Sequence, residues 1–456
     1  MIIYKDFIKT IKKVFRSWLT IESKKNMDFI KERRVIFIHK KGPEGATENY
    51  RPLSINNTLP RIFLKILNQK LEYTWDKITS SQFGFRKKFD TRIAVIKFQA
   101  KYKELKKTHR SKISILTIDI AKCYDSISYL LIRESIKKFV ENIYIKNFLL
   151  RYYQGDGMGL YQGDPLSPIL FAYISHFLIY KIEQIVKYAQ MFADDLIIIT
   201  KGSDEENKEK LKMIYQVIVQ FGLKPNESKT IETKDPKKII YLGIWLNPLK
   251  HLNSNKEKAQ KTYQKYKYIL LHKGFSRGLR IQLFKSFVLS QIDYGLEIFE
   301  YSKSQMTTLN TWINKRVKKI LDVPIATPTE ILQIECNIKD MNVNLNKRKV
   351  KLMEKLTTLN LDELKTEIQF QKYEFNTIDW ANISSINTNY FIIQEIKNKI
   401  EKTNKKKVKI YLIIINKQNI NFKAQKYLNW HQSSTIFKFR SHMTCLNRDR
   451  YSQFHF

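Results

Sequence analysis

The chain has 456 residues, and its 82 Lys and Arg against 43 Asp and Glu give it a formal net charge of +39 at pH 7. A chain of this length can bury a sizeable core in two or three subdomains, and so large an excess of positive charge predicts a polyanionic partner. The three cysteines, Cys123, Cys336 and Cys445, lie far apart and exclude a disulfide framework and a multi-cysteine zinc module.

The first part of the chain is expected to form a helix and a strand hairpin. Apolar residues at helical spacing predict the helix over 2–18, and residues 34–41 form a strand that ends in Lys40 and Lys41. The Gly, Pro and Glu residues that follow mark a turn, so Lys40 or Lys41 and Arg51 are expected to face each other across the hairpin.

The most informative stretch is 188–200, in which two apolar arms flank the adjacent acids Asp194 and Asp195. The arms predict a hairpin with both carboxylates at its tip, where like charges repel each other unless a cation lies between them. Asp119 closes a strand predicted over 112–118, just before a short helix, and is placed to supply a third carboxylate. Three such groups can hold two Mg²⁺ ions about 4 Å apart, the arrangement for in-line phosphoryl transfer. The alternative for the acidic pair is a solvated surface turn.

Periodicity and turn signals predict the other elements in outline. In chain order they are a helix over 59–75, a glycine-centred loop at 82–86, a helix from Thr91, a buried helix over 169–185, a short strand over 241–246 and a basic, one-sided helix from about 250.

The motifs form an ordered series that resembles the reverse transcriptases. Phe192-Ala193-Asp194-Asp195 resembles the family's signature, and Asp119 to Asp125 resembles its first catalytic block. The other matching blocks, in the family's order, are Asn49 to Ser54, Gln82 to Arg86, Gln162 to Pro168, Gly222 to Thr230 and Tyr241 to Gly243. Downstream blocks similar to the thumb and connector of non-LTR (LINE-type) retrotransposons are Ile292 to Gly295, Leu321 to Pro324 and Thr327-Pro328.

The resemblance implies an α+β, right-hand polymerase fold, with fingers, a palm of antiparallel sheet and buried helices, a helical thumb and a mostly helical C-terminal region. The implied domains are an N-terminal helix and finger lead-in over 1–48, fingers and palm over 49–248, a thumb over 249–330 and a basic connector over 331–456. Asp119, Asp194 and Asp195 are the implied catalytic residues. Together with Ile120 they are the implied ligands of two Mg²⁺ ions, with Mn²⁺ as the alternative metal.

The resemblance also assigns roles around this centre. Lys40 or Lys41 and Arg51 match residues that contact the incoming triphosphate, and the alternative for them is a solvated hairpin edge. Tyr124, one turn into the helix expected after Asp119, matches an aromatic steric gate against the ribose 2′-hydroxyl, and the alternative is an ordinary core tyrosine. The other implied contacts are Gln162 with the template base, Gly163 with the nucleotide, Lys229 with pyrophosphate, Arg86 with template phosphate, and Tyr241, Leu242 and Gly243 with the primer end. For Lys229 the alternative is an ordinary surface lysine, and for Arg86 it is a cap on a neighbouring helix.

The expected partners are an RNA template, a DNA primer, the RNA/DNA hybrid and deoxynucleoside triphosphates (dNTP). No membrane is expected, since no run of about eighteen apolar residues indicates a transmembrane span. Only about fifty residues precede the finger blocks, too few for a folded nuclease, so any endonuclease is expected to be a separate protein. The alternatives to an active RNA-directed DNA polymerase are a catalytically silent RNA-binding scaffold and a group II intron maturase-like protein. The resemblance favours the nucleus, with the mitochondrion as the alternative because residues 1–19 are apolar and Lys-rich.

Overall fold

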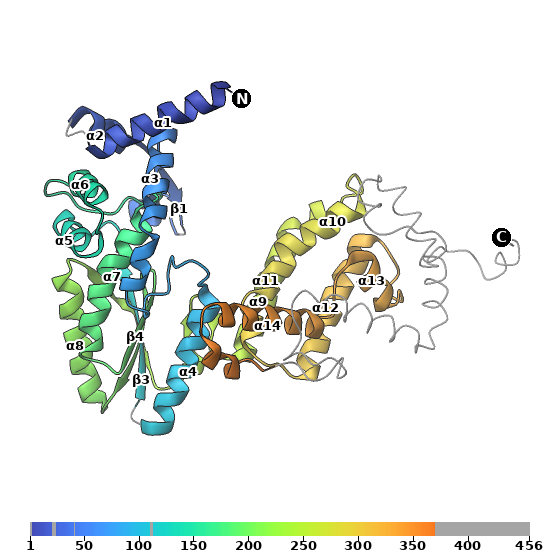
Figure 1. The fold of residues 1–456 in the computed structure, drawn as a ribbon. Helices are drawn as coiled ribbons and strands as arrows, with labels where there is room; N and C mark the ends of the chain where they lie inside the picture. Colours follow the sequence, from blue (N-terminus) through green and yellow to red (C-terminus); the bar gives the residue numbers. More distant parts are fainter. Residues whose placement is uncertain (1, 21–23, 41, 110–112, 370–456) are drawn as a thin grey trace, which may run out of the picture. The chain divides into compact units, whose positions relative to one another are not determined.

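The structure is a computed structural model that describes residues 2–20, 24–40, 42–109 and 113–369. The chain divides into two compact units, Met1–Gly243 and Ile244–Phe456 (Figure 1). Lys41, Cys445 and the predicted connector beyond residue 369 lie outside the described residues.

A four-stranded antiparallel sheet forms the centre of the first unit. Its strands, in order across the sheet, are β4 (Tyr188–Phe192), β5 (Asp195–Lys201), β3 (Ile113–Ala121) and β6 (Lys224–Thr233). Successive side chains of a strand point to opposite faces, and the alternate residues Leu116, Ile118, Leu196 and Ile198 lie in the main hydrophobic core.

Helices cover both faces of this sheet (Figure 1). α7 (Ser167–Glu183) contacts β4 and α8 (Asp204–Gln220) contacts β5 and β6, while α4 (Thr91–His109) contacts β3 and β4. α7 is apolar on almost every side and buries eleven of its residues, as the sequence predicts. The antiparallel sheet with its packed helices confirms the predicted α+β class.

The segment after Asp119 differs from the predicted short helix. β3 extends past Asp119, residues 122–126 form a turn, and α5 (Tyr129–Phe139) begins only afterwards. Lys122 has a φ of 45°, in the left-handed region that regular helices of L-residues do not use. Tyr124 therefore lies in a turn and not in a helix.

The helices at the start of the chain pack against α3 (Thr58–Lys70) and α6 (Ile143–Tyr152). The other elements here are α1 (Ile2–Thr20), α2 (Lys24–Lys31), β1 (Arg33–His39) and β2 (Tyr50–Asn56). Phe15 and Trp18 of α1 each place their ring 5.2 Å from that of Phe63 in α3, between ring centroids. β1 and β2 form the predicted antiparallel hairpin.

The described part of the second unit is almost entirely helical. Its elements are α9 (Pro248–Leu271), α10 (Arg277–Phe284), a π-helix (Lys285–Leu289), α11 (Ser290–Asp293), α12 (Lys303–Leu321), α13 (Thr329–Cys336) and α14 (Met341–Thr358). As predicted, α9 is one-sided: Ala259, Tyr263 and Leu270 are buried, while Lys261 and Lys265 are exposed. None of the described helices is long and apolar enough to span a membrane.

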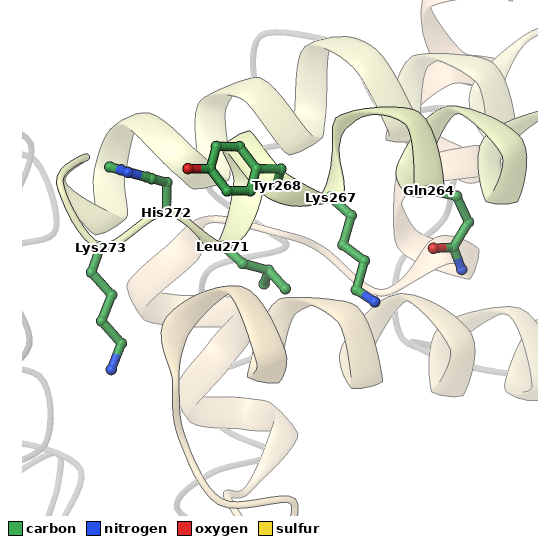
Figure 2. Close-up of a pocket in the computed structure, with 6 residues that line it drawn as sticks. All are labelled: Gln264, Lys267, Tyr268, Leu271, His272 and Lys273. Atoms are coloured by element: carbon green, nitrogen blue, oxygen red, sulfur yellow. The ribbon is translucent and has the colours of Figure 1, made fainter.

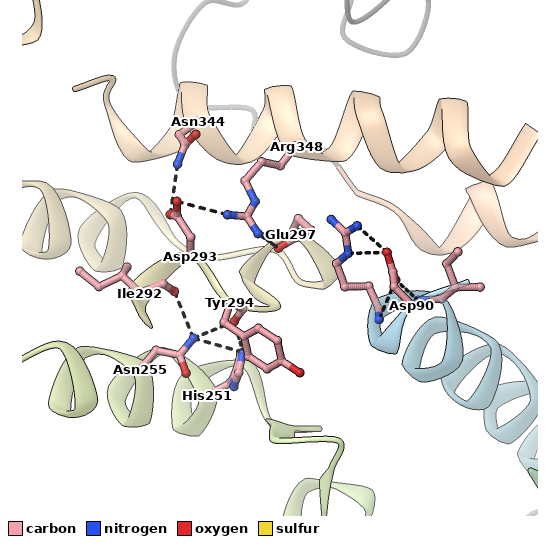
Figure 3. Close-up of polar contacts among 11 residues, drawn as sticks. Asp90, His251, Asn255, Ile292, Asp293, Tyr294, Glu297, Asn344 and Arg348 are labelled. Carbon is pink, nitrogen blue, oxygen red and sulfur yellow. Dashed lines mark hydrogen bonds and ion pairs between the residues drawn. The ribbon is translucent and has the colours of Figure 1, made fainter. Parts of the chain in front are cut away.

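A polar network ties α14 to the start of this unit (Figure 3). Arg348 Nη2 lies 2.8 Å from Glu297 Oε1, and Arg348 Nη1 lies 3.2 Å from Asp293 Oδ2. On α9, Asn255 Nδ2 donates to the Ile292 carbonyl at 3.1 Å and to the Tyr294 carbonyl at 2.8 Å. These bonds hold the Ile292 to Gly295 segment between α9 and α14.

Candidate active site

The predicted hairpin carries the acidic pair at its tip. β4 and β5 pair up to the tip, so that only Ala193 and Asp194 form the turn before Asp195 begins β5. Continuing the register of β3 on β5 by one residue places Asp119 opposite Asp195. Residues so paired point to the same face of a sheet, with Cβ atoms about 5 Å apart. The fold therefore brings the three carboxylates from two distant segments to one end of the sheet.

The neighbouring carboxylates change the electrostatics of Asp195. Its pKa is raised from 3.8 to about 6, first because the surrounding protein removes water from it, and then because Asp194 and Asp119 add negative charge. Burial raises the pKa of the Tyr124 hydroxyl, and the charge of Asp194 raises it further. Tyr124 thus belongs to the environment of the acidic turn, although its turn was not predicted.

Two side chains of β6 hold Asp119. Its Oδ2 accepts one hydrogen bond of 3.0 Å from Lys229 Nζ and another of 3.2 Å from Asn226 Nδ2. Within the described residues, no three His, Cys, Asp or Glu side chains are grouped closely enough to hold a metal ion. The cation found at Asp119 is the Lys229 ammonium. Asn226 lies in the Gly222 to Thr230 block, but the sequence assigned it no role.

The chemistry of these donors nevertheless fits a divalent metal. Carboxylate oxygens are the hard ligands that Mg²⁺ prefers, and Asp194 and Asp195 are exposed to solvent. The side chain of Asp119 is 39% exposed, so an ion can reach all three. A cation between them would also relieve the repulsion that raises the pKa of Asp195.

Tyr124 is fixed by a stacked ring beneath it. Its ring lies 4.8 Å from that of Phe171 in α7, with an angle of 14° between the planes, and its carbonyl accepts a 2.7 Å hydrogen bond from Leu160 N–H. The tyrosine is only partly exposed to solvent.

The loop that contains Gln162 and Gly163 packs on finger strand β2. Ser54 N–H donates to the Gln162 carbonyl at 2.7 Å. Gly163 has a φ of 103°, and a Cβ there would lie 2.6 Å from the Ser54 carbonyl oxygen. Glycine is needed at this position because both the backbone conformation and the close strand exclude a side chain.

A buried network that no motif predicted holds the same loop from behind. Asp164 accepts a 2.7 Å hydrogen bond from the Tyr152 hydroxyl and lies 3.8 Å from Arg33 Nη1. The Arg33 guanidinium also lies 3.4 Å from the centre of the Tyr161 ring and donates to the Tyr152 hydroxyl at 3.1 Å. Burial raises the pKa of Asp164. The position of Asp164 in the Gln-Gly-Asp-Pro block was the only feature of the sequence that could have indicated this network.

Comparison with known proteins identifies the domain that carries this site. A family model described as reverse transcriptase (RNA-dependent DNA polymerase) matches residues 38–246. Residues 38–246 of this chain are therefore a reverse transcriptase domain. The matched region contains Asp119, Asp194 and Asp195, together with the palm sheet and the finger loop around Gln82.

Two curated relatives are similar to parts of this chain. The COX1/OXI3 intron 1 protein of Saccharomyces cerevisiae is 23% identical over 290 residues, which cover 49% of this chain and 33% of that protein. The retrovirus-related Pol polyprotein from type-2 retrotransposable element R2DM of Drosophila melanogaster is 24% identical over 234 residues, covering 44% of this chain and 21% of that protein. The chain thus spans about a third or less of the length of either relative.

Similar solved structures include yeast telomerases. The telomerase of Candida albicans in complex with the TWJ fragment of telomeric RNA has a TM-score of 0.42 and 14% identity, covering 92% of this chain and 68% of that one. The apo telomerase of Candida tropicalis has a TM-score of 0.41 and 14% identity, covering 74% of this chain and 68% of that one.

In the reverse transcriptase domain, the predicted triphosphate contacts lie on the finger hairpin. Arg51 pairs with Ile38, while Lys40 N–H bonds to the Asn49 carbonyl at 2.8 Å, two residues further along. The exposed side chains of Lys40 and Arg51 are therefore diagonal neighbours and do not lie directly opposite each other.

Arg86 is occupied by the protein itself. Its guanidinium donates to the carbonyls of Gln82, Ile78 and Thr79 at 2.9, 2.7 and 2.8 Å. Burial lowers the pKa of Arg86, with Asp76 acting in the opposite direction. This geometry favours the structural alternative for Arg86 over a contact with template phosphate.

The segment predicted as one short strand at 241–246 is divided in two. β7 (Ile240–Tyr241) and β8 (Ile244–Trp245) are separated by Leu242 and Gly243, which have φ values of 52° and 77°. Tyr241 is buried against Phe98, and its hydroxyl accepts a 3.1 Å hydrogen bond from Gln190 Nε2. Of the three predicted primer contacts, Gly243 is exposed, Leu242 is half-buried and Tyr241 is buried. The Tyr241 ring therefore belongs to the core.

The second unit contains an open cavity of about 590 Å³ at the end of α9 (Figure 2). It is lined by Gln264, Lys267, Tyr268, Leu271, His272 and Lys273. Tyr268 is 79% exposed, and its ring lies 5.6 Å from that of His272. The stretch 258–285 contains eight Lys and Arg residues and no Asp or Glu. Arg277 and Arg280 are buried, while five lysines are exposed and make this surface positive: Lys258, Lys261, Lys265, Lys267 and Lys273.

Proposed function

We propose that this chain is an RNA-directed DNA polymerase that extends a primer 3′-hydroxyl on an RNA template by two-metal phosphoryl transfer, as in non-LTR retrotransposition. The observation that carries the proposal is the meeting of Asp119 with Asp194 and Asp195 at one end of the palm sheet, inside the matched domain. A protein that served only as a scaffold would have no need for three carboxylates that repel one another.

The three carboxylates would hold the divalent ions, with Mg²⁺ as the proposed metal and Mn²⁺ as a substitute. Ile120 would add its backbone carbonyl. Ile120 lies opposite Pro225 of edge strand β6. Because proline has no N–H, the two residues form a non-hydrogen-bonded pair of the antiparallel ladder. The backbone groups of Ile120 are then expected to point toward β5 and the acidic turn, while its side chain stays in the core.

When bound, the metals would activate the primer hydroxyl and neutralise the leaving pyrophosphate. Asp119 would be one of the carboxylates that hold the metals. The Lys229 ammonium, 3.0 Å from Asp119 Oδ2, would lie beside the site, where it can bind a pyrophosphate oxygen or give it a proton. Tyr124, supported by Phe171, would lie against the nucleotide sugar and exclude a 2′-hydroxyl.

Positive surfaces would bind the other partners, namely the dNTP, the RNA template and the DNA primer. Lys40 and Arg51 would contact the triphosphate from the finger hairpin. In the second unit, Tyr268 offers an exposed ring on which a base can stack, and Lys267 beside it can contact a phosphate. The net charge of +39 supports such nucleic-acid contacts.

Primer extension on poly(rA) with oligo(dT) and Mg²⁺ tests the proposal. The wild type should extend the primer, and Asp194→Asn should abolish extension while RNA affinity stays within about twofold, because the substitution removes a metal ligand and leaves the basic surfaces intact. Asp156→Asn, in an exposed loop, is the matched control and should extend like wild type. RNA binding without extension by the wild type would instead indicate a catalytically silent scaffold.

The similarity to the COX1/OXI3 intron 1 protein favours a second candidate, an intron-encoded maturase-like protein on the same fold. Splicing of an intron RNA in vitro that requires this chain would support the maturase. If Asp194→Asn spliced normally, the acidic centre would be irrelevant to that activity.

A further inference from the structure

Gln82 is a fully buried glutamine whose side chain bonds to the acidic turn. Its Oε1 accepts hydrogen bonds from Ala193 N–H at 3.1 Å and Gly84 N–H at 2.8 Å. Its Nε2 donates to the Ala193 carbonyl at 3.3 Å and to Ser175 Oγ at 2.9 Å. A carboxamide can accept two hydrogen bonds and donate two, so this side chain is fully used. The two backbone N–H donors also decide which end of the amide carries the oxygen.

The backbone of the loop around Gln82 also supports the turn, because it forms hydrogen bonds with β4 just before the turn. Met191 N–H bonds to the Ser81 carbonyl and Phe83 N–H bonds to the Met191 carbonyl, both at 2.8 Å, so the loop pairs with the last part of β4. A Cβ at Gly84 would lie 2.2 Å from the Ala193 nitrogen. Glycine is therefore required at position 84 because the backbone of the acidic turn lies too close for a side chain.

The turn needs such support for two reasons. Ala193 has a φ of 54°, which costs a residue with a Cβ about 1 kcal/mol or more. Asp194 and Asp195 follow it directly, and their like charges favour any movement that separates them. A turn with these properties keeps its shape only where its surroundings hold it, and Gln82 binds both the N–H and the carbonyl of Ala193.

We propose that Gln82 is a positioning residue for catalysis: its carboxamide fixes the Ala193 backbone so that Asp194 stays beside Asp119 and Asp195. The effect on primer extension rests on the proposed function. The effect on divalent-ion binding does not, and can be measured without nucleic acid.

The test is Gln82→Met, which keeps most of the volume and removes all four hydrogen bonds. The expected result is a kcat for primer extension about ten- to a hundredfold lower, with KM for dNTP and Kd for primer–template within about twofold. Mn²⁺ binding to the free protein, followed by electron paramagnetic resonance, should weaken about tenfold. Gly84→Ala would place a Cβ against the Ala193 nitrogen and so displace the turn directly. It should give the same pattern of losses.

Asn207→Ala is the matched control. Asn207, on α8, is as buried as Gln82. Its amide donates a 3.2 Å hydrogen bond to Ser114 Oγ, away from the acidic turn. It should lose thermal stability as Gln82→Met does, yet keep kcat and Mn²⁺ affinity. If Gln82→Met fails to fold, Ser175→Ala, which removes one anchor of the amide, should lower kcat and Mn²⁺ affinity in milder form.

Wild-type kcat and Mn²⁺ affinity in Gln82→Met, or in Ser175→Ala where that variant replaces it, would overturn the inference. Losses equal to those of Asn207→Ala would overturn it too, because they would reflect stability alone. If the wild type bound Mn²⁺ but extended no primer, the proposed function would fail, and the metal-binding comparison would still decide the role of Gln82.

Discussion

Replacing Asp195 by asparagine should stabilise the protein while destroying its proposed activity. The pKa of Asp195 is raised from 3.8 to about 6, so the folded state binds this proton more tightly than the unfolded chain does. Wild-type stability therefore falls as the pH rises from about 4 through 6, and the loss is complete above that range. Asp195→Asn has no such titration and escapes the loss.

The shift of about two pKa units corresponds to roughly 3 kcal/mol for a group shielded from solvent. Asp195 is exposed, and screening by water should reduce the gain in the free energy of unfolding to about 1 kcal/mol at pH 7.5. Urea unfolding of wild type and Asp195→Asn at pH 4, 6 and 7.5, without divalent ions, measures this difference in the free energy of unfolding. The variant's advantage should be absent at pH 4, grow to its full value above pH 6, and shrink when Mg²⁺ is added to both proteins.

Asp156→Asn, in an exposed loop of the same unit, is the control for removing one negative charge and should show no such pH-dependent gain. A destabilised Asp195→Asn at pH 7.5, or a gain that is equal at all three pH values, would refute the account in which burial and the charges of Asp194 and Asp119 together penalise the ionised Asp195 carboxylate.

Three further predictions concern the surroundings of the site. Tyr124→Val should raise ribonucleotide incorporation relative to deoxynucleotide incorporation by about tenfold or more in single-nucleotide kinetics, because the proposed gate is removed; an unchanged ratio would mean that Tyr124 is only a core residue. Arg33→Met should cost about 3–5 kcal/mol in urea unfolding, since it leaves the buried Asp164 carboxyl without its cation. The double variant Arg33→Met/Asp164→Asn should recover much of that loss, and equal losses in both would contradict the pairing. Gly163→Ala should cost about 1–3 kcal/mol in the same assay, because its Cβ would meet the Ser54 carbonyl at a left-handed backbone position; wild-type stability would disprove the close approach.

Local patterns in the sequence determined the elements of the site. The two apolar arms on either side of Asp194 and Asp195 predict β4, β5 and the turn between them, because strand and turn preferences act between near neighbours. The same holds for the one-sided face of α9. Where the local signal is weak, the prediction was wrong: the short stretch after Asp119 forms a turn and not a helix.

The tertiary structure alone decided which side chains hold those elements. Gln82 meets Ala193 across 111 residues and Lys229 meets Asp119 across 110, and nothing beside either residue in the chain marks these partners. In the structure, Arg86 donates hydrogen bonds to carbonyl groups of the protein and the Tyr241 ring is buried in the core, and the local sequence indicated neither environment. The sequence by itself determined the strands, the acidic turn and the chemistry that three carboxylates permit. The bracing of that turn was decided only by the fold, because long-range contacts depend on how the whole core packs and not on neighbours along the chain.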